Sequence, residues 1–206
     1  MTSRRAASLP WIISLAVVGA TAGAEWLEGR RWWCACGQGY LWESDIWSEH
    51  CSQHLADPYA FSHLAHGLVF YAMLAWIPGP WQRMSFAWKF CVANLVECAW
   101  EVLENSEFII QRYRAETISI GYVGDSIINS MGDVLAAALG VLVARLIGWK
   151  WTLLLFVAVE VAMAATIKDN LTLNVIMLVW PIEAIKKWQS AGHSIGVSPS
   201  LLWPRR

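Results

Sequence analysis

Charged residues are scarce in this sequence. Asp, Glu, Lys and Arg make up 15% of its 206 residues, whereas about a quarter of an ordinary soluble domain is charged. Hydrophobic residues make up 57%, and 15 residues are tryptophan, which gathers at the edges of membranes. The composition therefore disfavours a water-soluble domain and predicts an integral membrane protein in contact with a lipid bilayer.

Three further features are lacking. No basic cluster is interleaved with aromatic residues and the formal net charge is only −1, so nucleic acid is not an expected partner. The five cysteines lack the paired spacing of a zinc ribbon. Neither an internal repeat nor a linker interrupts the chain, so residues 1–206 are expected to form a single integral membrane domain.

Apolar residues concentrate in six segments. Their approximate bounds are 10–28, 59–77, 84–104, 125–147, 151–167 and 171–185. A transmembrane helix needs about 20 mostly apolar residues. The last segment is short and contains Pro181, so it is expected to be kinked or to enter only part of the bilayer. The pattern predicts an all-α, polytopic transmembrane helical bundle of about six segments.

The first segment has two interpretations. Arg4 and Arg5, a following apolar run and the small residues Ala22-Gly23-Ala24 fit a cleaved signal peptide. The apolar run continues through Trp26 and Leu27, however, and this favours an uncleaved first transmembrane helix.

The distribution of Lys and Arg predicts the orientation. With the N-terminus inside, ten of them fall on the inner side, namely Arg4, Arg5, Arg83, Lys89, Arg145, Lys150, Lys186, Lys187, Arg205 and Arg206. Five fall outside, namely Arg30, Arg31, Arg112, Arg114 and Lys168. Because positive charge accumulates on the cytoplasmic side, both termini are expected in the cytoplasm of a bacterial inner membrane. Residues 29–58 and 105–124 then form outer loops.

Ionisable residues recur at helical spacing inside the apolar segments. Two stripes result, one of Glu97, Glu101 and Glu104 and one of Asp125, Asn129 and Asp133, with Asp125 expected as the N-cap of its helix. A rise of about 1.5 Å per residue places His66, Glu97, Asp133 and Glu160 roughly 9 to 12 Å below the outer boundary. Ionisable groups inside a membrane are costly and mark functional sites.

This layer has three interpretations. It is a divalent metal site of nitrogen and oxygen ligands, formed by His63, His66, Glu97, Glu101 and Asp133. Alternatively, Glu97, Glu101, Asp133 and His66 are catalytic acids and bases, because burial raises carboxylate pKa values towards neutrality. The third interpretation is a buried polar network that fixes the helix register.

Arg112 and Arg114 flank this layer in the second outer loop. A guanidinium group suits phosphate or carboxylate, so both are expected, with Asn129 and Asp125, to bind an anionic lipid or a lipid-linked substrate. The leading functional hypothesis is an enzyme acting on such a substrate. The alternatives are a proton-coupled carrier, with Glu160 and Glu97 as relay, and a structural or assembly protein without catalysis.

The first outer loop carries three cysteines. One residue separates Cys34 from Cys36, which strains a disulfide between them, so a disulfide from Cys51 to either is expected. A metal site of Cys34, Cys36 and His50 or His54 ranks second, because its spacing is not standard. His50, His54 and Asp57 are otherwise interpreted as polar loop residues.

Several motifs together resemble an uncharacterised family of bacterial multi-pass inner-membrane proteins. They are CACG, SQHLADPYAFSHLAHG, WEVLENSEFIIQRYRAETIS, YVGDSIINSMGD and DNLTLNVIML, which cover residues 34–178 with gaps. The resemblance implies an integral inner-membrane protein and no particular activity. The His-rich motif, the Glu-bearing segment and the G-D-S-x-x-N-x-x-x-D pattern are also similar to VanZ-like membrane proteins.

Overall fold

The computed structural model describes residues 2–192, and every regular element within them is a helix, which confirms the all-α class. The elements are α1 (Thr2–Leu27), α2 (Ala60–Trp76), the 3-10 turn η1 (Pro80–Arg83), α3 (Phe86–Glu104), α4 (Glu107–Glu116), α5 (Ile127–Thr166), α6 (Leu171–Val179) and α7 (Glu183–Ser190). Predictions that involve Met1, His193, Arg205 and Arg206 concern positions outside the described residues.

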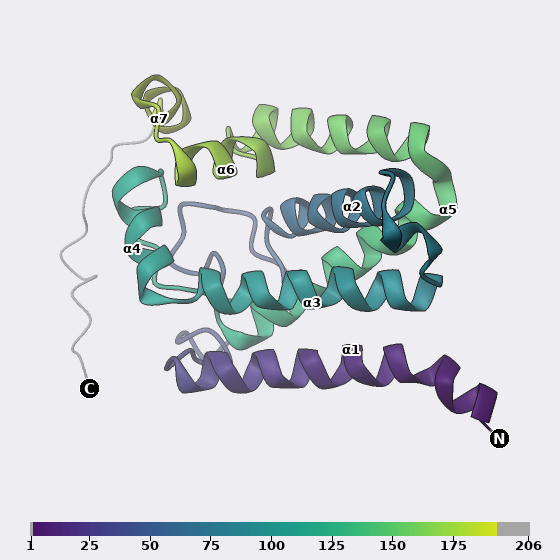
Figure 1. The fold of residues 1–206 in the computed structure, drawn as a ribbon. Coiled ribbons are helices and arrows are strands. Elements are labelled where there is room, and N and C mark those ends of the chain that lie inside the picture. The colour runs from purple at the N-terminus through teal and green to yellow at the C-terminus, as the bar shows by residue number, and fades with distance from the viewer. Residues whose placement is uncertain (1, 193–206) are drawn as a thin grey trace.

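The long helix α5 consists of two arms. Gly148 interrupts it with a φ of 77°, a left-handed conformation that glycine adopts without strain. After this kink the second arm runs back in the opposite direction, on the side of the bundle where α2 lies (Figure 1). The two apolar segments expected around 125–147 and 151–167 are therefore the two arms of one kinked helix.

The long helices lie side by side in one bundle (Figure 1). The axes of α1, α2, α3 and the second arm of α5 are roughly aligned, with successive long helices running in opposite directions. The first arm of α5 crosses them at an angle, and α4, α6 and α7 gather at one end. Among the described residues, two stretches are long and apolar enough to cross a membrane, Ala7–Leu27 and Ile127–Thr166. The helix α2 is apolar but shorter.

Three local predictions are corrected. Residues 105–124 are not a simple loop, because they contain the helix α4. Ser106 caps the start of this helix, and the side chains of Ile109 and Tyr113 lie on its buried face. Ser126, not Asp125, is the N-cap of α5, with its hydroxyl accepting from the Asn129 N–H. The apolar segment expected to reach residue 185 ends as α6 at Val179, two residues before Pro181.

The first helix packs against α3. The rings of Trp11 and Phe90 meet at a tilt with centroids 5.0 Å apart, and Asn94 Nδ2 donates to the Ser14 carbonyl at 3.4 Å. Glu25, near the end of α1, is fully buried. These contacts favour the uncleaved interpretation of the N-terminal segment, which stays a prediction.

The most intimate helix packing joins α2 to the first arm of α5. A Cβ added at Gly67 would overlap the carbonyl oxygen of Ala137, and one at Gly140 would overlap that of Leu64. Small residues let helix backbones approach this closely, as is common between membrane helices. An apolar core borders this contact, formed by Leu68, Tyr71, Ala93, Val141 and Ala144.

Replacement of Gly67 by alanine tests this contact. Because the new methyl group meets backbone atoms that cannot rotate away, we expect Gly67→Ala to destabilise the protein by about 1–3 kcal/mol. Gly23→Ala, in a helix position with no atom within 4 Å, is the matched control and should be neutral or slightly stabilising. Thermal unfolding in detergent measures both, and equal midpoints would contradict the packing.

Candidate functional site

The predicted layer of ionisable residues converges around His63. Its Nδ1 donates to Glu97 Oε1 at 2.6 Å and lies 3.2 Å from Glu101 Oε1, while its Nε2 lies 4.0 Å from Asp133 Oδ2. His66 Nδ1 donates to the other Glu97 oxygen, Oε2, at 3.0 Å. Glu97 thus bridges the two histidines. We call these five residues the His–carboxylate layer.

Three helices supply the layer. One turn of α2 separates His63 from His66, so both face α3, where Glu97 and Glu101 are likewise one turn apart. Asp133 reaches the layer from α5, two turns before Gly140, where α5 touches α2. The close packing of these helices therefore sets the distance between the histidines and Asp133.

The layer is deeply buried and incompletely paired. Glu97 and Glu101 have no exposed surface, and Asp133 is 3% exposed. Among the described residues, Glu101 Oε2 and Asp133 Oδ1 have no hydrogen-bond partner, and Glu101 Oε1 has only the 3.2 Å ion-pair contact with His63 Nδ1. A buried carboxylate without a partner is costly, so such oxygens call for a proton or a cation.

A cavity of about 990 Å³ borders the layer. His63, His66 and Asp133 line it from the bundle, and Glu104 and Asp125 line it where α3 ends and α5 begins. Among the described residues that line it, there is no Lys or Arg. The cavity is therefore acidic and better suited to a cation than to a free anion.

Tyrosines donate hydrogen bonds to the two carboxylates at this end of the cavity. Tyr122 Oη donates to Asp125 Oδ2 at 2.9 Å, and Tyr113 Oη donates to Glu104 Oε1 at 2.8 Å. Asn105 Nδ2 also donates to Asp125, at 3.2 Å. Burial, reinforced by the nearby Glu104 charge, raises the pKa of Asp125 to about 7.

Asn129, expected to bind substrate, instead ties the first loop to α5. Its Nδ2 donates to the His54 carbonyl at 2.8 Å and lies 3.3 Å from Asp57 Oδ2. Burial raises the pKa of Asp57, and its carboxylate accepts from the N–H groups of Ser52 and Tyr59. Asn129 does not line the cavity in the described structure, whereas Asp125 does.

The two arginines expected to bind an anion lie outside the cavity lining. Arg112 Nε donates to the Leu178 carbonyl at 2.9 Å, and Arg114 Nε donates to the Tyr122 carbonyl at 2.5 Å. Both therefore support the chain around the cavity. An anion-binding role for them stays a prediction.

Glu160, expected at a depth similar to that of the layer, makes its hydrogen bonds to the start of α6 and not to the layer. Its two oxygens accept from the N–H groups of Leu171 and Thr172, at 3.1 and 3.0 Å. A carboxylate in this position satisfies unpaired donors at the start of α6. Because both Glu160 oxygens are bound at the start of α6, this geometry gives little support to a proton relay between Glu160 and Glu97.

Sequence reasoning missed Glu25. It is fully buried near the end of α1, and neither of its carboxylate oxygens has a hydrogen-bond partner among the described residues. The sequence offered one clue, a single acidic residue at the end of a long apolar helix. Only the packing of α1 in the structure shows that this residue is buried.

The cysteines of the first loop are not joined by a disulfide. All five cysteines are free, and Cys51 Sγ lies 4.0 Å from Ser52 Oγ. Cys34 Sγ instead lies 3.2 Å from His50 Nδ1, and Cys36 Sγ lies 3.9 Å from His54 Nε2. The structure therefore reverses the expected order of the two interpretations for this loop.

Comparisons with known proteins match nearly the whole chain. The family described as "Protein of unknown function (DUF2585)" matches residues 26–191. A UPF0314 protein of Paracoccus denitrificans (strain Pd 1222) is 47% identical over 192 residues, covering 93% of this chain and 96% of that protein. A UPF0314 protein of Sphingopyxis alaskensis is 43% identical over 182 residues, covering 88% and 95%. No solved structure matches the chain.

The raised pKa of Asp125 predicts a pH dependence of stability. Its folded-state pKa of about 7 exceeds the ordinary value of 3.8, so the folded protein holds a proton that the unfolded chain releases. The free energy of unfolding should therefore fall as pH rises from about 4 to about 7. Asp125→Asn keeps an acceptor for Tyr122 but cannot ionise, so its unfolding temperature should fall less over this range. The control is the exposed Asp45→Asn, and identical slopes for all three proteins would refute the prediction.

Proposed function

The chain belongs to the DUF2585 family of proteins of unknown function, and we propose that it is a multi-pass membrane enzyme. In this proposal the His–carboxylate layer binds a divalent metal ion, and the adjoining cavity receives an amphipathic lipid or lipid-linked substrate. The observation that carries the proposal is the convergence of two histidines and three buried carboxylates beside a large cavity.

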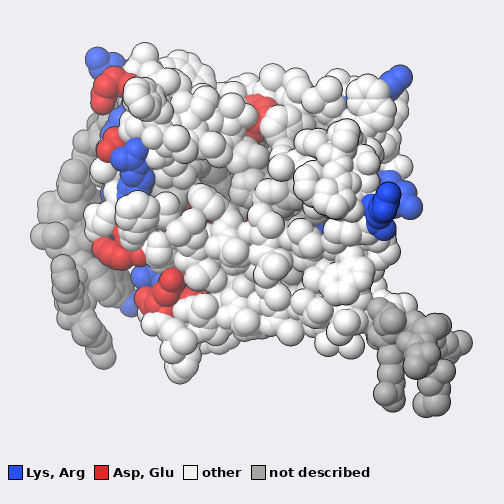
Figure 2. All heavy atoms as spheres, viewed as in Figure 1, with Lys and Arg blue, Asp and Glu red and all other residues white. Residues whose placement is uncertain are grey.

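The distribution of side chains supports a membrane setting. In Figure 2 charged side chains gather at the two ends of the visible face, and the middle is almost free of them. The first arm of α5 presents a stripe of exposed leucines at helical spacing, namely Leu135, Leu139, Leu142 and Leu146. Outward-facing leucines of this kind suit contact with lipid.

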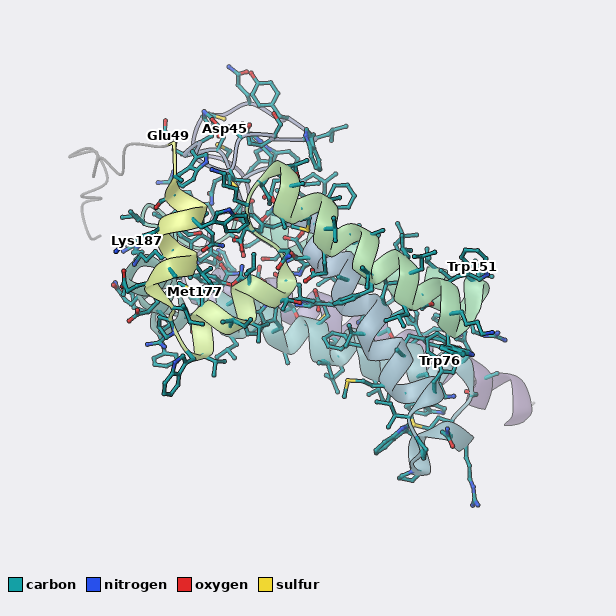
Figure 3. The ribbon with its side chains drawn as sticks, turned by 90° about the horizontal axis from the view of Figure 1, so that it is seen from above. Asp45, Glu49, Trp76, Trp151, Met177 and Lys187 are labelled. Carbon is teal, nitrogen blue, oxygen red and sulfur yellow. The ribbon has the colours of Figure 1, made fainter. Side chains whose placement is uncertain are left out.

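We propose five membrane-crossing segments, formed by α1, α2, α3 and the two arms of α5, and a sixth segment, the nine-residue α6, that enters only part of the bilayer. Figure 3 places Trp76 and Trp151 at one end of the molecule, and Asp45, Glu49 and Lys187 at the other. The turns at the tryptophan end are flanked in sequence by Arg83, Lys89, Arg145 and Lys150. Lys186 and Lys187, predicted on the inner side, lie instead at the cavity end, where Lys186 Nζ donates to the Ala115 carbonyl at 2.6 Å, because the short α6 does not carry the chain back across the bundle. The four residues beside the tryptophan-end turns favour the cytoplasm for that end, so in this proposal the cavity end faces outward from an inner membrane.

The donor set of the layer suits a divalent metal. Single ligand atoms of His63, His66 and Glu97 lie within 4.8 Å of one another, close enough to share one ion. Imidazole nitrogens and carboxylate oxygens from facing helices are the ligands used in metal sites inside helical bundles. A bound cation would also neutralise the carboxylate charge that the described structure leaves unpaired. Such an ion activates water and polarises phosphoryl or carbonyl oxygens.

The protein groups around the ion would then divide the remaining work. Glu101 and Asp133, with unpaired oxygens, are placed to hold or accept a proton. An anionic substrate group has no Lys or Arg to contact in the described lining of the cavity, so the ion is its natural partner. Val69, Phe70, Val96, Trp100 and Leu178 provide apolar wall for the lipid portion.

A carrier is less well supported by this geometry. A carrier needs a polar route beyond the layer, towards the tryptophan end of α2. There the described structure places the apolar core, with Leu68, Tyr71 and Val141 packed together. The enzyme hypothesis requires only the access that the cavity offers.

Glu97→Gln tests the metal site. Glutamine keeps the size of the side chain but replaces an ionised ligand with a neutral amide, so we expect at least about 10-fold weaker binding of Mn²⁺, an ion that prefers oxygen and imidazole ligands, to the detergent-purified protein. The matched control is Glu107→Gln, an exposed change on α4, which should bind metal like the parent chain. If Glu97→Gln lowers the unfolding temperature and leaves metal binding unchanged, the layer is a structural network and the enzyme proposal fails.

A pair of cysteine variants tests the orientation. Asp45→Cys and Lys150→Cys place exposed thiols at opposite ends of the molecule. With the parent chain as the baseline, a membrane-impermeant maleimide should label the first variant in intact spheroplasts and the second only in inverted vesicles. The reverse pattern would place the cavity on the cytoplasmic side.

A further inference from the structure

A second cluster of metal-ligand residues lies in the first loop, away from the His–carboxylate layer. Ligand atoms of Cys34, Cys36, His50 and His54 all lie within 4.8 Å of one another. The closest pair is Cys34 Sγ and His50 Nδ1, at 3.2 Å. We propose that these two cysteines and two histidines bind one zinc ion that holds the loop together.

The donor chemistry selects the metal. Two thiolates and two imidazoles match the four-coordinate, tetrahedral sites that Zn²⁺ occupies in proteins. Sulfur ligands disfavour Mg²⁺ and Ca²⁺, which prefer oxygen. The site thus differs in kind from the oxygen-rich layer inside the bundle, and the two can be distinguished experimentally.

Local geometry is already suited to the ion. The Cys36 N–H points at Cys34 Sγ, 3.5 Å away, a contact that stabilises a thiolate. His54 is 1% exposed, and its Nδ1 has no hydrogen-bond partner among the described residues. The rings of Trp33 and Tyr40 lie against His54, with centroids 6.5 and 5.1 Å away, and restrict its orientation.

The loop needs such a link. Residues 28–59 contain no helix, and their one β-bridge joins Trp42 to Ala56. A long irregular segment pays a large entropic cost for order, which a metal bound to distant positions offsets. Here the ion would join residues 34 and 36 to residues 50 and 54, and so close most of the loop.

The same link would shape the mouth of the cavity. The chain between and beside the two histidine ligands supplies part of the cavity lining, namely Ile46, Trp47, Ser48, Glu49, Cys51, Ser52 and Gln53. Zinc would therefore hold the outer wall of the cavity in place without taking part in chemistry at the layer. This inference does not depend on the proposed enzymatic function.

Cobalt substitution tests the site in the full-length protein. Co²⁺ bound to thiolates gives a sulfur-to-metal charge-transfer absorption, which nitrogen and oxygen ligands do not produce. We expect this absorption with the parent chain at one equivalent of Co²⁺, and its displacement by Zn²⁺. Cys36→Ser removes one of the two thiolates at an exposed side chain, so the absorption should fall by about half or more while the protein remains folded.

Two controls assign the signal. Cys51→Ser changes a cysteine of the same loop outside the cluster, and Glu97→Gln disables the layer, so both should keep the charge-transfer absorption. The proposal is overturned if the parent chain shows no such absorption, or if Cys51→Ser abolishes it. It is equally overturned if peptide mapping of the native protein finds Cys51 in a disulfide with Cys34 or Cys36.

Discussion

Burial of carboxylates among apolar helices is the constraint on which this structure depends. Glu97, Glu101 and Asp133 are nearly or fully inaccessible, and so is Glu25. In a medium of low polarity each ionised group must have a partner, a proton or a cation. His63 and His66 provide partners for some of these carboxylate oxygens. The remaining oxygens are available to bind a proton or a cation.

Close approach of helix backbones makes this arrangement possible. Gly67 and Gly140 bring α2 and α5 together so tightly that no side chain fits between them. The same two helices carry His63, His66 and Asp133, so the packing contact and the candidate site are parts of one structural unit. Loss of the contact would separate the histidines from the carboxylate of α5.

The first loop, residues 28–59, packs against the start of α5 and closes one side of the cavity. Asn129 and Ser126 on the α5 side bind the backbone of His54 and Gln53, and the loop then forms one wall of the cavity. The two proposed metal sites would serve the same cavity in different ways. The loop site would hold its wall in place, and the site in the His–carboxylate layer would face its interior.

Helical periodicity by itself determined the all-α class, the approximate segments and the faces on which His63, His66, Glu97, Glu101 and Asp133 lie, because these depend on residues three or four apart. Membership of an uncharacterised family was also predictable from the sequence motifs, and the comparisons confirm it. Only the tertiary structure decided that Glu160 caps α6, that Asn129 binds the loop, that Glu25 is buried and that the cysteines meet histidines rather than one another. Each of these outcomes depends on which segments the chain path brings together, and spacing along one segment carries no information about its neighbours in space.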